Sequence, residues 1–224
     1  MVFELHYFIA WFLFWTLGWL GIYYFLPKER TNYERNYIFV SIYFLVISII
    51  MILYFKDIIF EVYKYLNFFS VILIVLLLIF NFLSYRFANK YLIKPAEKLL
   101  KYADNYYLHL DKRYIISKSF DILFQQILII ALVFLLRNNG LNLLWISILF
   151  AIMFGIGHIP ALKVDRSLFG LVIFVASLLS SFLFPYLIIT FKYGFVYTYM
   201  AHWLFYTNTG VLFWIIENFK SKMK

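Results

Sequence analysis

Three apolar stretches in the second half of the chain carry polar side chains that are able to do chemistry. Gln125 and Gln126 lie in the first stretch, His158 in the second, and His202 in the third, followed one helical turn later by Tyr206. A histidine can transfer a proton, a glutamine can hydrogen-bond a water, and a tyrosine hydroxyl can donate to an oxyanion. Taken alone, each histidine is also explained as a hydrogen-bonded packing residue, so only the three stretches together point to a catalytic or binding site.

His158 shares its predicted helix face with small residues. Ala151, Gly155 and His158 lie at positions i, i+4 and i+7, which fall on one side of a helix. Small side chains on such a face allow a neighbouring backbone to approach closely. The spacing therefore favours a close helix–helix contact beside His158.

These three stretches resemble the CPBP (Abi) family of intramembrane endopeptidases, which includes CAAX-processing proteases and bacteriocin-processing relatives. The family motifs EExxxR, FxxxH and HxxxN lie on successive helices of its membrane core. The second motif stands here as Phe154 to His158, and His202 represents the third. Gln125 and Gln126 stand in the place of the two glutamates. The resemblance covers the chain from roughly Ser117 to Trp214.

The resemblance implies a catalytic set made of Gln125, Gln126, His158, His202 and Tyr206. In the family, the glutamates and histidines activate a water that attacks the scissile amide, and the asparagine helps to stabilise the oxyanion. Here both glutamates are glutamine, which cannot accept a proton, and Tyr206 stands where HxxxN has asparagine. General base catalysis is typically worth about 10²–10⁴-fold, so its loss weighs heavily against peptidase activity.

Three functions follow from this pattern. The first is a weakly active or non-catalytic homologue, a pseudoenzyme, that binds a peptide or a lipid in the former groove. The second is an active intramembrane endopeptidase that faces the cytoplasm and uses a modified site on a peptide or membrane-protein substrate. The third is a transporter, which the lack of buried charge and of any internal repeat disfavours.

We expect no required cofactor. Catalytic zinc usually has three protein ligands drawn from histidine, cysteine and carboxylate. The sequence has no cysteine, and Asp121 and Glu217 lie at the ends of predicted spans, so no acidic residue is expected deep inside one. A metal held by His158 and His202 stays open as a weaker alternative.

The elements that position these residues follow from composition. Of the 224 residues, 65% are hydrophobic and 14% are charged, against roughly 45–50% and 25% in a soluble domain. Apolar runs of about 18 residues recur, each long enough to cross a hydrocarbon core of roughly 30 Å as a helix. Lipid offers the backbone no hydrogen-bond partners, which favours helices. The sequence therefore predicts an all-α, polytopic transmembrane helical bundle that forms a single membrane domain over residues 1–224.

We predict about seven spans, near residues 5–26, 37–55, 68–85, 121–136, 143–162, 168–190 and 194–216. Pro185 lies inside the sixth span and is able to kink or divide it, so six or eight crossings stay open. Asn81 in the third span is expected to hydrogen-bond a neighbouring helix. Residues 95–110 show apolar side chains at helical spacing and are expected to form an amphipathic helix on the cytoplasmic leaflet.

The orientation follows from the basic residues of alternate loops. With seven spans, 16 of the 20 Lys and Arg residues fall on one side and 4 on the other. The positive-inside rule then places the N-terminus outside and the C-terminus in the cytoplasm, in the cell membrane. The formal charge of +9 is explained by contact with anionic headgroups, so the lipid bilayer is the expected partner and nucleic acid is not.

The chain contains no cysteine, so single cysteines introduced at loop positions report the topology directly. Cysteines at Lys28, Lys112 and Lys222 are expected to be shielded from an impermeant thiol reagent in intact cells. A cysteine at Arg137 is expected to be labelled. Labelling of the Lys222 position from outside would contradict an odd number of spans.

Overall fold

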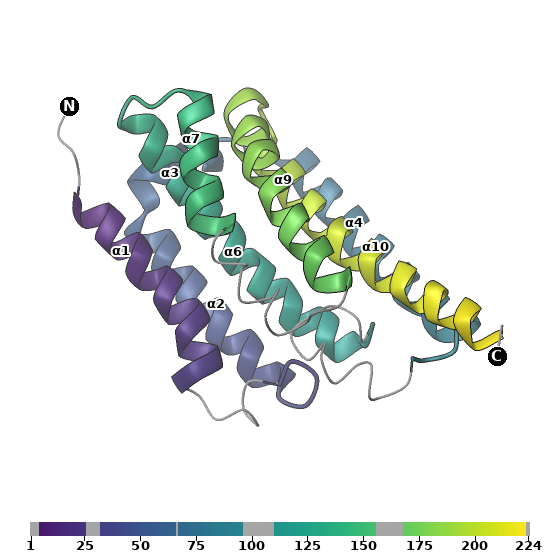
Figure 1. Cartoon of the computed structure of the whole chain (residues 1–224). Helices are drawn as coiled ribbons and strands as arrows, with labels where there is room; N and C mark the ends of the chain where they lie inside the picture. The colour runs from purple at the N-terminus through teal and green to yellow at the C-terminus, as the bar shows by residue number, and fades with distance from the viewer. Residues whose placement is uncertain (1–4, 26–31, 66, 96–109, 156–167, 223–224) are drawn as a thin grey trace.

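The computed structural model describes residues 5–25, 32–65, 67–95, 110–155 and 168–222, and these residues form helices and turns with no strand. Figure 1 shows the helices as one bundle. They are α1 (Leu5–Thr16), which continues as the π-helical η1 (Leu17–Phe25), α2 (Tyr37–Tyr54), α3 (Lys56–Tyr63), α4 (Phe68–Tyr91), α6 (Lys112–Asn138), α7 (Leu143–Phe150), which continues as the π-helical η3 (Ala151–Gly155), α9 (Leu168–Thr190) and α10 (Gly194–Lys222).

The helix at the centre of the bundle is α6. It packs against α1, α2, α3, α7, α9 and α10, and Figure 1 shows it between the pair α1 and α2 and the pair α9 and α10. Within the apolar part of α6, 83% of the residues are buried, against 17% for α4. Because other helices shield α6, it is able to carry polar side chains that a lipid-facing helix carries only at high cost.

Five stretches are long and apolar enough to cross a membrane: Leu5–Ile22, Tyr37–Tyr54, Phe68–Tyr91, Lys112–Asn138 and Leu171–Thr190. The apolar helix Leu143–Phe154 is shorter, and α10 is 29 residues long but less apolar. The outward faces of these helices are also apolar, as Leu53, Leu83 and Leu179 illustrate with exposed fractions of 65%, 56% and 67%. Water is a poor solvent for such a surface.

Several predicted boundaries need correction. The fourth span was expected to begin at Asp121, but α6 begins at Lys112, so Asp121 lies in its third turn. The third span was expected to end near residue 85, but α4 continues to Tyr91. Pro185 does not divide its helix, because α9 runs without interruption on both sides of it. The predicted amphipathic helix over 95–110 lies almost entirely outside the described residues.

Side-chain hydrogen bonds connect neighbouring helices. Trp11 of α1 donates from Nε1 to the Leu128 carbonyl of α6 across 2.9 Å. Thr207 of α10 donates to Oδ1 of Asn81 on α4, and both side chains are buried. The expected role of Asn81 between helices is therefore confirmed. Bonds of this kind hold helices together where burial of apolar surface gives little preference for protein over lipid.

Close backbone approach adds to these contacts at Gly18 in η1. A side-chain carbon added at Gly18 would overlap the ring of Phe124 on α6. Phe124 is 1% exposed and has little room to move aside. Glycine at this position therefore allows the N-terminal helix to lie directly against the central one.

Candidate functional site

The described part of the chain holds a buried ion pair inside the bundle. Nζ of Lys118 lies 2.6 Å from Oδ2 of Asp121, and each residue is 2% exposed. Both belong to α6 and are three positions apart, so they share a face of the helix. Asp121 was expected at the end of a span, and Lys118 lies outside the predicted spans. Both are instead buried within α6, because this helix starts earlier than predicted and is enclosed by its neighbours.

The carboxylate of Asp121 accepts three hydrogen bonds. Besides Lys118, the hydroxyl of Tyr33 donates to Oδ2 across 3.0 Å, and Nε2 of Gln125 donates to Oδ1 across 2.8 Å. Tyr33 is held in turn because its own carbonyl accepts from the hydroxyl of Ser117 at 2.8 Å. A buried charge is costly unless it is paired and hydrogen-bonded, and here both conditions are met.

The ammonium of Lys118 also contacts aromatic rings. Its Nζ lies 4.4 Å from the ring centroid of Tyr206 on α10 and 5.6 Å from that of Tyr33. Ring faces carry partial negative charge and attract a cation at these distances, more strongly when water is excluded. Tyr206 therefore contacts the ion pair through its ring, which links α10 to the polar face of α6.

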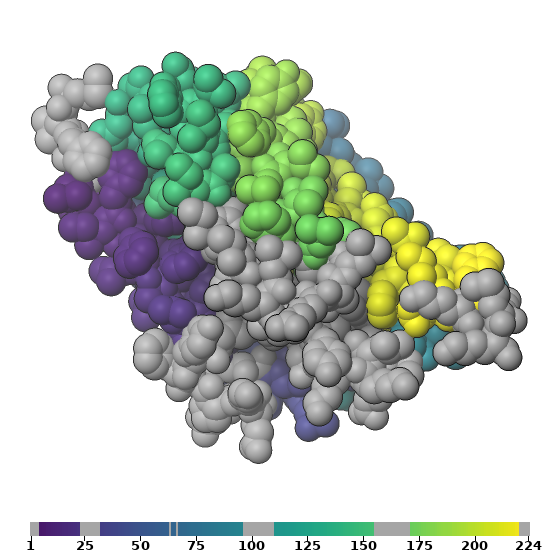
Figure 2. All heavy atoms as spheres, in the orientation of Figure 1, coloured from purple at the N-terminus to yellow at the C-terminus, as the bar shows by residue number. Residues whose placement is uncertain are grey.

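Lys118, Asp121, Tyr33 and Gln125 form one polar network. Through Gln125, this network reaches a cavity of ≈ 210 Å³ between α6, the α7–η3 helix, α9 and α10. Figure 2 shows α9 at the surface of the molecule between α7 and α10. The walls are mostly apolar and rich in aromatic rings. They comprise Gln125, Ile129, Phe150, Phe154, Ile173, Ala176, Ser177, Leu179, Ser180, Leu183, Phe184, Ala201, His202, Phe205 and Tyr206.

The structure brings three of the five predicted site residues to this one cavity: Gln125, His202 and Tyr206. The rings of His202 and Tyr206 are stacked, with centroids 5.4 Å apart and an angle of 26° between planes. The ring of Phe184 on α9 lies 5.8 Å from that of His202. His202 is thus held between α9 and the next turn of its own helix.

Of the remaining two predicted residues, Gln126 does not line the described cavity wall. Gln126 faces α10 away from the cavity, where its Nε2 donates to the hydroxyl of Thr198. Within the described part of the chain, Oε1 of Gln126 is buried and accepts no hydrogen bond. His158 lies outside the described residues, so its position relative to His202 stays a prediction.

The contacts between α6 and α10 explain how Gln125 and His202 come together. Gln126 contacts Thr198, and Lys118 contacts Tyr206. The residue numbers fall along α6 as they rise along α10, so the two helices run antiparallel. This register places His202 between those two contacts, level with Ile122 and about one helical turn from Gln125.

Two residues of the network, Lys118 and Asp121, carried a signal in the sequence. They are opposite charges at i and i+3, followed by Gln125 at i+4 from the aspartate. Tyr33 carried none, because it precedes α2 by a few residues and lies 88 positions from Asp121. Ser177 and Ser180 lie in an apolar stretch that also contains other serines. No spacing rule distinguishes the two that line the cavity from the others.

No group of three or more His, Asp or Glu side chains able to hold a metal ion occurs among the residues that the structure describes. The described part of the cavity offers His202 alone as a nitrogen ligand of that kind. Asp121 does not line the cavity, and its oxygens already accept from three donors within the protein. The described residues therefore form neither a metal centre nor a carboxylate positioned to take a proton from a water in the cavity.

Comparison of the chain with models of known families, with curated proteins and with solved structures finds no match.

Breaking the buried pair is expected to be strongly destabilising. Lys118→Met or Asp121→Asn leaves one polar group without its partner in the core, which typically costs about 3–5 kcal/mol of unfolding free energy. The double variant is expected to lose less than the sum of the two, as measured by denaturant unfolding of the purified protein in detergent.

The exposed pair Glu61 and Lys64 provides a matched control, because it has the same i, i+3 spacing and 57% and 40% exposed side chains. Its neutralisation by Glu61→Gln with Lys64→Met is expected to leave stability unchanged within error. Additive effects of Lys118→Met and Asp121→Asn would contradict a coupled pair.

Proposed function

We propose that the chain is a multi-pass membrane protein with seven crossings, its N-terminus outside and its C-terminus in the cytoplasm of the cell. The crossings are α1 with η1, α2, α4, α6, α7 with η3, α9 and α10. The apolar outward faces support contact with lipid. The lower hydropathy of α10 has a structural reason, because Thr198, His202 and Tyr206 face the polar face of α6 or the cavity rather than lipid.

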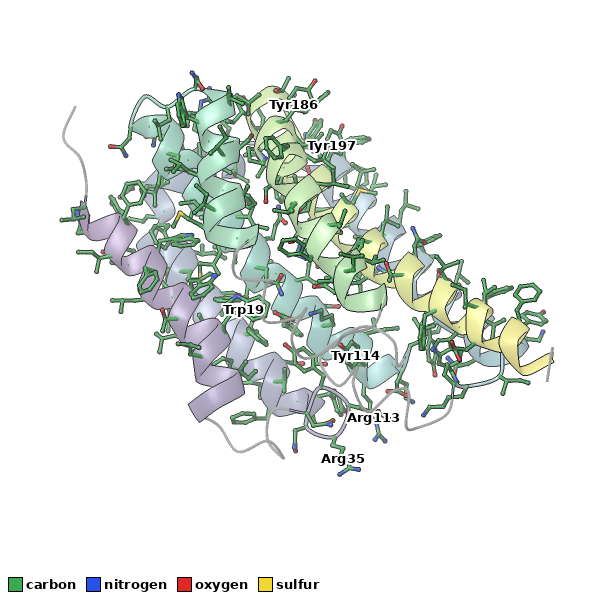
Figure 3. All side chains as sticks on the ribbon, viewed as in Figure 1. Trp19, Arg35, Arg113, Tyr114, Tyr186 and Tyr197 are labelled. Atoms are coloured by element: carbon green, nitrogen blue, oxygen red, sulfur yellow. The ribbon has the colours of Figure 1, made fainter. Side chains whose placement is uncertain are left out.

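The proposed orientation is supported by where labelled side chains lie. Figure 3 shows Arg35 and Arg113 at one end of the bundle and Tyr186 and Tyr197 at the opposite end. Arginine near the ends of spans is enriched on the cytoplasmic side, and tyrosine is common at both interfaces. The end that carries Arg35 and Arg113 is therefore the proposed cytoplasmic end.

We further propose that the protein is a non-catalytic, CPBP-like membrane protein that binds a peptide or lipid segment in the cavity beside Gln125. The observation that carries this proposal is that Gln125, His202 and Tyr206 line one mostly apolar cavity. Ligand sites are typically apolar with a few convergent polar groups, and this wall has that composition. Neither glutamine is able to act as a base, and the network commits Gln125 and Asp121 to each other.

The active-endopeptidase alternative differs in one requirement, namely a group that removes a proton from water. Only a histidine is able to serve in that role at this cavity, since no carboxylate is among the described residues that line it. The transporter alternative gains the buried Lys118–Asp121 pair as a feature typical of transport pathways. Both partners are, however, fully engaged with neighbouring side chains, which favours a structural role.

A cleavage assay separates the non-catalytic role from the enzymatic one. The purified protein in detergent is expected to cleave leader-type and CAAX-type test peptides no faster than its His158→Ala and His202→Ala variants. The physical reason is the missing general base, a loss of about 10²–10⁴-fold in rate. Robust cleavage that disappears in the His158→Ala variant would establish the endopeptidase and overturn this proposal.

Occupancy of the cavity is testable with toluene, because apolar cavities of about 150 Å³ bind a benzene ring. Toluene is expected to raise the thermal unfolding midpoint of the protein in detergent by mass action. Ala176→Phe fills the cavity and is expected to abolish the shift. Val175→Phe, on the 44% exposed outer side of the same helix, is the matched control and is expected to retain it. An equal shift in all three proteins would show that toluene acts on the micelle.

A further inference from the structure

The orientation of the Gln125 amide is fixed by its neighbour. Asp121 is paired with the Lys118 ammonium and acts as a hydrogen-bond acceptor, so Gln125 must turn its NH₂ group toward it, and the two atoms lie 2.8 Å apart. The carbonyl oxygen Oε1 then points away from Asp121. Gln125 is 4% exposed and lines the cavity, and this oxygen accepts no hydrogen bond from any described residue.

Two serines on the opposite wall of the cavity, on α9, also offer hydrogen-bond acceptors. The hydroxyl of Ser177 donates to the Phe174 carbonyl across 2.7 Å, and that of Ser180 donates to the Ser177 carbonyl across 2.8 Å. Their hydroxyl protons are therefore used within α9, and their oxygens remain able to accept. Gln125, Ser177 and Ser180 together give the cavity a set of acceptors with no matching donor among themselves.

The size and walls of the cavity restrict what fits against these acceptors. Its ≈ 210 Å³ is somewhat more than the roughly 150 Å³ that holds a benzene ring in an engineered apolar cavity. Phe150 and Phe154 are stacked at 4.5 Å in the wall, and Phe184 lies across from them on α9. Aromatic rings pack favourably against such walls in offset or edge-to-face geometry.

We propose that the cavity binds one aromatic group of about phenol size that carries an O–H or N–H donor, as the side chain of tyrosine or tryptophan in a membrane-embedded peptide does. This inference rests on the proposed binding function and deepens it by naming the ligand chemistry. The donor pairs with Oε1 of Gln125 or with a serine oxygen, and the ring fills the apolar part. The exposed Leu179 and Leu183 in the wall give such a side chain access from the lipid-facing surface.

The test compares phenol with anisole, which has nearly the same shape but no donor, and with 1-hexanol, an aliphatic donor of lipid type. Apparent dissociation constants come from the thermal unfolding midpoint as a function of probe concentration, with Ala176→Phe as the filled-cavity blank. One neutral hydrogen bond predicts that phenol binds about three- to tenfold more tightly than anisole. Phenol is also expected to bind more tightly than 1-hexanol.

Variants assign the preference to the acceptors. Gln125→Met keeps the approximate volume but removes Oε1, and is expected to lower the phenol-to-anisole ratio, because only the serine oxygens then remain as acceptors. Ser180→Ala serves as a second variant if Gln125→Met does not fold, and is expected to reduce the ratio. Equal affinity for phenol and anisole in the unmodified protein would overturn this inference, and tighter binding of 1-hexanol would overturn its aromatic part. Failure of toluene, phenol and anisole alike to bind would instead overturn the proposed binding function.

Discussion

The fold is organised around a pair of opposite charges that is buried inside the helix bundle. Lys118 and Asp121 lie on the same face of α6, and each is almost completely buried. Their burial is tolerable only if other groups complete the coordination of both charges. Tyr33, just before α2, and Tyr206, on α10, supply those groups, so satisfying this pair brings two distant segments of the chain against the central helix.

The other contacts of α6 with its neighbours also depend on specific side chains, but they bury no charge. Inside a membrane, helices gain little from burying apolar surface against each other, and specific packing and hydrogen bonds therefore decide which helices pair. Trp11 binds a carbonyl of α6 through its indole, and Gly18 allows the backbone of η1 to lie against Phe124. From Ile127 to Leu136, the residues of α6 are apolar and buried, because other helices surround this part of α6.

Much of the architecture was predictable from the sequence because hydropathy reports directly on which segments avoid water. Asn81 was also predictable as an interhelical residue, since an isolated amide in an apolar helix needs a partner. The buried charges were not predicted, because a basic residue before a long apolar run is usually a loop residue. Their spacing was informative, but whether a helical charge faces protein or water depends on the neighbouring helices. Tyr33 shows the same limit, because no local pattern connects it to Asp121.

The local network also explains why an amide suits position 125 of this chain. A glutamate there would place a second carboxylate one helical turn from Asp121, and like charges at i and i+4 repel each other. A single ammonium, Lys118, would then face two carboxylates inside a poorly solvated bundle. Glutamine keeps the hydrogen bond to Asp121 and adds no charge. In this geometry, the carboxylate at 121 and the amide at 125 are mutually consistent. Placing a carboxylate at 125 is therefore expected to require removing the charge at 121 as well.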